Sequence, residues 1–420
     1  MDTEHRPDEE KNQEEYSFIQ EIIKDEKMDA RKLTAKIGKW LCIGFLFGAA
    51  ACVGFFALRP WAETTFQKDP DKVEIPLDDE NAETETPEVT DSTEQELTIQ
   101  NYRELNEQLE AVALEAEKSI VQVTGIRQDE NWASGQNATL HQISGLIVAD
   151  NGPELLILTR YSDMKEAELF RVKFADSTEH EAVMKQKDGN SDLAIFSVAK
   201  DGITDDTWSK IKVAVLGNSH TLTRGRALIA LGSPFGYEDG IGYGVASTVD
   251  ETIILADGEY RILVTDMPGT KECNGFLFDS YGSVMGIINS DLIGKDGDGT
   301  LTVIGISAVK SEIELMSNGK NVSYVGIIGT MVTEEMSQAQ GIPVGLYVTE
   351  VEVDSPAMTA GIQSGDVITE IDGKKITSVS GYHKAVIGQE AGKTINLTGQ
   401  RYGAENYVDI EFHVTVGVKQ

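Results

Sequence analysis

Residues Pro268–Ser290 read PGTKECNGFLFDSYGSVMGIINS, a stretch in which turn residues alternate with short apolar runs. Pro and Gly residues recur in its first half and indicate a loop. Two apolar runs follow, Phe276–Phe278 and Val284–Ile288, and the second is rich in β-branched residues. The polar segment Asp279–Gly282 between them is typical of a tight turn. The stretch therefore predicts a turn-rich loop that leads into a β-hairpin.

The same pattern of short strands extends over residues 119–310. Apolar runs such as SGLIVAD, LLILT, LAIFSV, RALIALG and GYGVASTV alternate with turn residues, and long helical periodicities are missing from this region. Many short strands at regular spacing predict an all-β architecture of two barrels, which we expect to divide near Lys200–Lys210. Leu97–Lys118 predicts a helix whose apolar face either packs on the barrel, which we favour, or joins a short coiled coil.

Three segments resemble the HtrA/Deg family of trypsin-like proteases. Ser144–Val148 (SGLIV) resembles the family's GSGVII strand, and Leu231–Gly236 (LGSPFG) resembles its GNPFG turn. Gly275–Ile288 resembles the hairpin that follows its nucleophile. The resemblance covers roughly residues 110–415. It implies a mainly β protein, with a trypsin-like double β-barrel over residues 97–315, leading helix included, and a PDZ domain over residues 322–418.

Proteolysis by this family requires a nucleophile, a base that takes its proton and a carboxylate that orients the base. By resemblance to the family's motifs, the base position falls at Ser162, the orienting carboxylate at Asp192 and the nucleophile at Cys273. A serine hydroxyl does not accept a proton near neutral pH, so Asp192 has no imidazole to orient. These positions predict a trypsin-fold domain without peptidase activity.

An active serine- or cysteine-type endopeptidase that degrades misfolded extracytoplasmic proteins is the alternative. A thiol is intrinsically nucleophilic, and Lys271 would favour the thiolate of Cys273, although Glu272 would oppose it. The loop TKECNG lacks the glycines that let backbone N–H groups converge as an oxyanion hole. A substitute base would have to come from one of the six histidines, and none occupies the family's base position: His5, His141, His180, His220, His383 and His413.

The segment Gly345–Ser378, GLYVTEVEVDSPAMTAGIQSGDVITEIDGKKITS, resembles the PDZ domains of HtrA proteases at nearly every defining position. Ser355 and Pro356 predict the start of a short helix, and Gly361 predicts its end. The resemblance implies a groove that binds extended peptides by strand addition and captures a terminal carboxylate on backbone N–H groups.

By the same resemblance, the carboxylate loop of this groove consists of Tyr324, Val325, Gly326 and Ile327, and a helix near Ser380–Gln389 forms the other wall. The partners implied are unfolded proteins or peptide C-termini. The resemblance also implies a homo-oligomer, since members of the family often form trimers. An active HtrA-like relative is a further expected partner. A PDZ domain whose groove is closed by packing remains the alternative.

The N-terminal part predicts a single-pass membrane protein. Residues 1–39 are polar and predict a cytoplasmic tail, while Trp40–Leu58 carries no charge and is about as long as the roughly 20 residues that cross a bilayer. Basic residues precede this span and acidic ones follow it, which places the main domains outside the cytoplasm. A cleaved signal peptide is the alternative. The acidic segment 59–96 predicts an extended linker.

The charge balance excludes one class of partner. The net charge is −34 and the sequence pI about 4.5, so phosphate backbones would be repelled and no nucleic-acid partner is expected. The three cysteines build no disulfide framework and no metal-ligand spacing. We therefore expect no metal and no cofactor.

Overall fold

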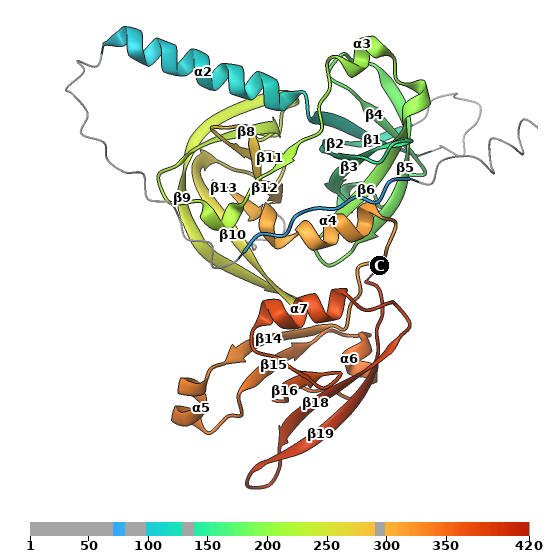
Figure 1. The fold of residues 1–420 in the computed structure, drawn as a ribbon, viewed down its shortest axis with the longest axis vertical. Helices are drawn as coiled ribbons and strands as arrows, with labels where there is room; N and C mark the ends of the chain where they lie inside the picture. Colours follow the sequence, from blue (N-terminus) through green and yellow to red (C-terminus); the bar gives the residue numbers. More distant parts are fainter. Residues whose placement is uncertain (1–69, 80–97, 128–137, 290–298, 420) are drawn as a thin grey trace, which may run out of the picture. The chain divides into compact units, whose positions relative to one another are not determined.

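The computed structural model describes residues 70–79, 98–127, 138–289 and 299–419 (Figure 1). The predicted tail 1–39, the predicted membrane helix Trp40–Leu58 and most of the acidic segment 59–96 lie outside these residues. Within the described ranges, no helix has the length and apolar character needed to cross a membrane. Residues 70–420 form one compact unit.

Six strands close into the first barrel in the order β1-β2-β3-β6-β5-β4. They are β1 (Ile120–Arg127), β2 (Ala138–Asp150), β3 (Glu154–Arg160), β4 (Leu169–Lys173), β5 (Glu179–Asp188) and β6 (Leu193–Ala199). Side chains alternate between the two faces of a strand. In β3, Leu155 and Ile157 pack inside this barrel, whereas Leu156 and Leu158 join a cluster shared with the second barrel. Both faces are buried, which explains why β3 reads as a continuous apolar run.

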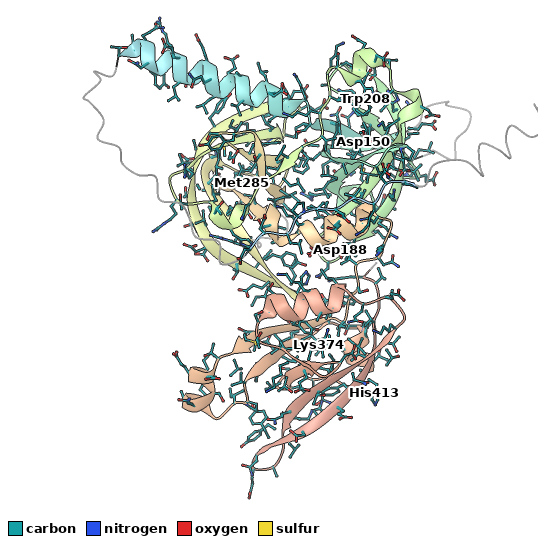
Figure 2. All side chains as sticks on the ribbon, viewed as in Figure 1. Asp150, Asp188, Trp208, Met285, Lys374 and His413 are labelled. Carbon is teal, nitrogen blue, oxygen red and sulfur yellow. The ribbon has the colours of Figure 1, made fainter. Side chains whose placement is uncertain are left out.

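The second barrel is a seven-stranded sheet in the order β11-β8-β9-β10-β13-β12-β7, closed by pairing of β11 with β12. The strands are β7 (Val215–Leu216), β8 (Ala227–Ser233), β9 (Gly240–Leu255), β10 (Gly258–Pro268), β11 (Asn274–Asp279), β12 (Ser283–Asn289) and β13 (Thr300–Gly305). The predicted hairpin is β11 and β12, in which Phe276 pairs with Ile287. Met285 of β12 belongs to the core inside this barrel (Figure 2).

Short helical segments connect these strands. They are η1 (Ser162–Met164), η2 (Lys200–Gly202), α3 (Asp205–Trp208), η3 (Ser219–Thr221) and η5 (Ile306–Ala308). The segments η2 and α3 lie between β6 and β7, where the polar sequence predicted the division between the barrels.

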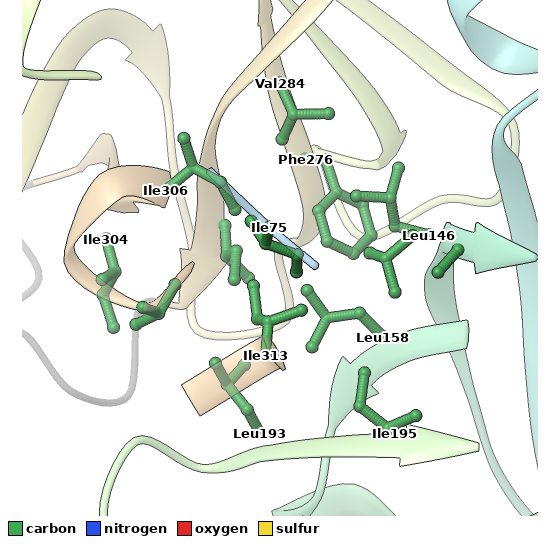
Figure 3. Packing of buried hydrophobic residues seen from close by; sticks show 14 of the residues in the cluster. Ile75, Leu146, Leu158, Leu193, Ile195, Phe276, Val284, Ile304, Ile306 and Ile313 are labelled. Atoms are coloured by element: carbon green, nitrogen blue, oxygen red, sulfur yellow. The ribbon is translucent and has the colours of Figure 1, made fainter. Parts of the chain in front are cut away.

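The two barrels meet in one apolar cluster, and α4 (Lys310–Ser317) contributes to it. Figure 3 shows Leu158 of the first barrel, Phe276 of the second and Ile313 of α4 around this shared core. Ile75 also enters the cluster, and the backbone N–H of Ile75 donates to Glu314 of α4 (3.0 Å).

Residues 70–79 correct part of the linker prediction. Val73 and Ile75 are buried, and the backbone N–H of Val73 donates to the side chain of Asn318 (2.9 Å). Asp78 forms an ion pair with the largely buried Lys310 (2.8 Å). This part of the acidic segment therefore packs on the barrels instead of extending away from them, because two apolar side chains and one paired carboxylate anchor it.

The leading helix α2 spans Ile99–Glu117 and starts at Thr98, whose side chain caps it. Ala113 and Ala116 near its C-terminal end are buried, whereas Leu105 is 54% exposed. The favoured expectation that the apolar face packs on the barrel therefore holds only for the last turns of the helix.

The C-terminal part is a PDZ-like sheet in the order β14-β15-β16-β18-β19, with β17 paired to β16. Its strands are β14 (Ile327–Val332), β15 (Gly345–Val351), β16 (Val367–Ile371), β17 (Lys374–Lys375), β18 (Thr394–Tyr402) and β19 (Tyr407–Thr415). Its helices are α5 (Glu334–Gln340), α6 (Pro356–Thr359) and α7 (Val379–Ile387). As the sequence predicted, Ser355 caps α6 by accepting the N–H of Met358 (3.1 Å).

Candidate functional site

The structure brings two of the three predicted triad positions together at the end of β3. The Ser162 hydroxyl donates to Asp192 Oδ2 (2.6 Å), and the Ser162 N–H donates to Asp192 Oδ1 (2.7 Å). Asp192 has a left-handed φ of 59°, which non-glycine residues seldom adopt. The Asp192 carboxylate therefore holds the hydroxyl of Ser162, the residue at the position that the motif resemblance predicts for the base.

Arg160 completes this pair and was missed in the sequence. Its side chain is 5% exposed, its Nη2 donates to the Ser162 hydroxyl (3.2 Å), and its Nε lies 3.5 Å from Asp192 Oδ2. A guanidinium does not give up its proton in proteins, so Arg160 cannot serve as a base. Its only signal in the sequence was a charge at the end of the apolar run of β3.

Cys273 lies in the interior of the second barrel. The residue is 0% exposed and belongs to an apolar cluster that includes Met267 and Leu277. Its sulfur accepts the N–H of Thr270 (3.1 Å) and lies 3.4 Å from the Thr270 hydroxyl. A substrate carbonyl cannot reach this sulfur without movement of the loop before β11.

The next residue, Asn274, joins the two barrels. Its Oδ1 accepts the backbone N–H of Ser144 (3.0 Å), and the Ser144 hydroxyl lies 3.5 Å from that of Ser233. Ser144 and Ser233 line a cavity of about 270 Å³, together with Gln122 of β1. The side chain that reaches from the start of β11 to the first barrel is therefore the amide of Asn274 and not a nucleophile.

Three histidines that we weighed as substitute bases have other contacts. His383 hydrogen-bonds Glu312 (2.9 Å), and His413 hydrogen-bonds Asn396 (2.7 Å). The ring of His180 lies 5.3 Å from that of Phe174. These contacts supply no base for Cys273.

The predicted carboxylate loop, residues 324–327, binds a carboxylate in this structure. The N–H groups of Val325, Gly326 and Ile327 all donate to the side chain of Asp257, at 2.6, 2.7 and 3.0 Å. Gly326 has a φ of 94°, a conformation that glycine adopts readily and that turns its N–H toward the same point as its neighbours. The side chain of Tyr324 is directed elsewhere and donates to Glu352.

Asp257 comes from the trypsin-fold domain, at the turn between β9 and β10. It is 3% exposed, and Tyr382 of α7 donates to its Oδ1 (2.8 Å). Burial raises the pKa of Asp257, and the three backbone N–H bonds oppose that rise.

His383 lies beside this contact and bridges the two domains. One ring nitrogen lies 2.9 Å from the Asp257 carbonyl oxygen and the other 2.9 Å from Glu312. Burial by itself would lower the pKa of His383, but the Glu312 carboxylate and the hydrogen bonds raise it to about 9. The ring is therefore an imidazolium at neutral pH.

Comparison with known proteins supports both domains. Residues 143–287 match the trypsin-like peptidase domain family, and residues 303–412 match the PDZ domain family. The serine protease Do-like HtrA of Lactobacillus helveticus is 27% identical over 292 residues, which is 65% of this chain and 68% of that protein. The periplasmic serine endoprotease DegP of Escherichia coli strain K12 is 28% identical over 296 residues, 68% of this chain and 59% of that protein.

The chain thus spans less than two thirds of the DegP protein's length. Among solved structures, the HtrA-type protease AlgW with decapeptide has a TM-score of 0.51 at 19% identity and covers 74% of this chain and 99% of that chain. This likeness concerns the fold. Together with the motif resemblance, these matches show a trypsin-like peptidase domain followed by a PDZ domain, the two domain types that make the chain similar to HtrA- and DegP-type proteases.

Proposed function

We propose that this chain is a non-catalytic HtrA-like protein whose PDZ domain binds peptide C-termini or unfolded proteins in extracytoplasmic protein quality control. The observation that carries the proposal is the set Ser162, Asp192 and Arg160, which leaves the base position without a group that accepts a proton near neutral pH. The buried sulfur of Cys273 supports it.

Peptide binding is supported by the groove itself. The three N–H groups of Val325, Gly326 and Ile327 converge on one carboxylate, as capture of a peptide's terminal carboxylate requires. β14 begins at Ile327 and lies at one end of the sheet, so one of its edges is available for strand addition. We assign peptide binding to the carboxylate loop and to the edge of β14.

The remaining partners follow from the sequence. We propose that Trp40–Leu58 anchors the chain in the cell membrane, with its N-terminus in the cytoplasm and its folded domains outside. The DegP relative is named as periplasmic, which agrees with an extracytoplasmic location. A homo-oligomer, such as a trimer, or an active HtrA-like relative completes the proposed set of partners.

The competing function is an active HtrA-type endopeptidase. The names of the two relatives favour it, since both are named as serine proteases. It would require that the loop before β11 bring Cys273 to the surface and that another group replace the base at Ser162.

Cleavage of a fluorescently labelled unfolded protein separates the two functions. Residues 62–420 and the Cys273→Ala variant are incubated with this substrate, beside an active HtrA-type protease as positive control. We expect no cleavage by either form, with binding of the unfolded protein retained in both. Cleavage by the parent chain that disappears in Cys273→Ala would establish a cysteine endopeptidase and refute the proposal.

A further inference from the structure

We propose that the trypsin-fold domain carries its own ligand for the PDZ domain. The side-chain carboxylate of Asp257 occupies the place of a peptide's terminal carboxylate, so a peptide that binds the carboxylate loop must first displace it. The inference rests on the proposed peptide binding and adds an occupant that the same chain supplies.

The first observation is the set of donors on Asp257. Both oxygens of this one side chain accept backbone N–H groups from consecutive residues: Oδ2 from Val325 and Gly326, and Oδ1 from Ile327. A carboxylate with several backbone N–H donors is held by charge-assisted bonds, which are short and strong. Because a second carboxylate would find the same donors taken and a like charge beside it, the loop holds one carboxylate at a time.

The second observation is the backbone contact that accompanies the first. The N–H of Asp257 donates to the carbonyl oxygen of Ile327 (2.7 Å), while the N–H of Ile327 donates to the Asp257 side chain. Neighbouring residues of an antiparallel strand direct their polar groups to alternate sides. Both polar groups of Ile327 thus face Asp257 and not β15, so Asp257 makes the first contact of an added strand as well as the carboxylate contact.

The third observation is how the hairpin presents this residue. Ala256 and Asp257 form the tight turn between β9 and β10, since Leu255 pairs with Gly258, and Asp257 has a left-handed φ of 58°. Gly258 permits the close approach, because a Cβ there would lie 2.9 Å from Tyr260 and 3.0 Å from His383. The turn is therefore shaped to fit against the PDZ domain.

The occupied groove lowers the affinity for peptides in a predictable way. The apparent dissociation constant equals the intrinsic one divided by the fraction of molecules in which the loop is free. If Asp257 fills the loop in about nine molecules out of ten, its removal strengthens peptide binding about tenfold. The loop is filled by the buried Asp257 side chain in this structure, and we take this occupancy as the value that the experiments below test.

Hydrogen exchange tests the internal contact without any peptide. The full chain, Asp257→Asn and Asp257→Gly are compared, since both substitutions suit a left-handed turn residue. Asp250→Asn is the matched control, because Asp250 lies on the same hairpin with an 80% exposed side chain. We expect amide exchange over residues 325–327 to rise at least tenfold in both Asp257 variants and to stay unchanged in the control. Unchanged exchange in the Asp257 variants would overturn the inference, whether or not peptides bind.

Peptide binding then tests displacement. The probe is a pool of fluorescein-labelled decapeptides randomised at their last four positions, prepared as free acids and as C-terminal amides. We expect the free acids to bind the Asp257 variants about tenfold more tightly than the parent chain, and the amides to bind neither. Equal affinity of free acids for parent and variants would overturn displacement while leaving the proposed function intact. Absence of free-acid binding to all forms would overturn the proposed function, and displacement with it.

Discussion

The protonated ring of His383 is expected to stabilise the fold in a pH-dependent way. Its side chain is 14% exposed, and its hydrogen bond to the fully buried Glu312 accompanies a pKa of about 9, against an ordinary value of 6.5. A pKa that is raised in the folded state means that the folded state binds the proton more tightly. The stabilisation is complete below pH 6.5 and is lost as the pH rises through 9.

The magnitude follows from the two pKa values. With about 1.4 kcal/mol for each tenfold change in proton affinity, the full contribution is about 3 kcal/mol. About 2 kcal/mol of it remains at pH 7.5, and almost nothing remains at pH 10. His383→Gln removes the titrating group, so this variant is expected to lose most at pH 6 and little at pH 10.

The unfolding free energy is measured by urea unfolding of residues 62–420 at pH 6, 7.5 and 10, with far-UV circular dichroism as the signal. The matched control is His413→Gln, because His413 is an exposed histidine on β19 (Figure 2). The unfolding free energies of the parent and His383→Gln should converge toward pH 10, whereas those of the parent and His413→Gln should run parallel throughout. A difference between the parent and His383→Gln that stays constant over this range would refute the reasoning.

Two further predictions concern the trypsin-fold domain. Alkylation of Cys273 by iodoacetamide, located by peptide mass spectrometry, is expected to be at least about 100-fold slower in the native chain than in urea, because access to a fully buried thiol needs local unfolding. Equal rates would contradict the buried position. Ile313→Ala is expected to lower the unfolding free energy by about 3 kcal/mol, since Ile313 is 0% exposed in the cluster between the barrels. Val353→Ala, at a 76% exposed residue, should change it by less than about 0.5 kcal/mol, and an equally small loss at Ile313 would contradict the proposed packing.

Local patterns account for what could be predicted of the fold. The hairpin of β11 and β12 was visible in residues 268–290 because turn residues and β-branched runs act over a few positions. The cap of α6 by Ser355 was visible for the same reason. Residues 70–79 were misread because acidic composition dominates that segment, while its anchors are only Val73 and Ile75, whose burial depends on partners more than 200 positions away.

In the candidate sites too, local motifs predict some features, whereas others depend on distant parts of the chain. The motifs placed Ser162 and Asp192, and the structure joins them by hydrogen bonds. The role of Arg160 could not be predicted, because a linear pattern does not show whether a charged side chain at the end of a buried strand points into the protein or into solvent. The burial of Cys273 was equally invisible, since a loop's direction depends on the barrel beneath it.

The order of the two domains and the residues at the predicted triad positions could be read from the sequence, because strand periodicity, turn chemistry and family motifs are local properties of the chain. What each side chain contacts depends on how distant segments pack together. Asp257 reads as an ordinary turn residue, yet 68 to 70 positions separate it from the backbone N–H groups that it accepts. A buried carboxylate is stable only where several donors converge, and here they converge because the turn between β9 and β10 packs against the carboxylate loop.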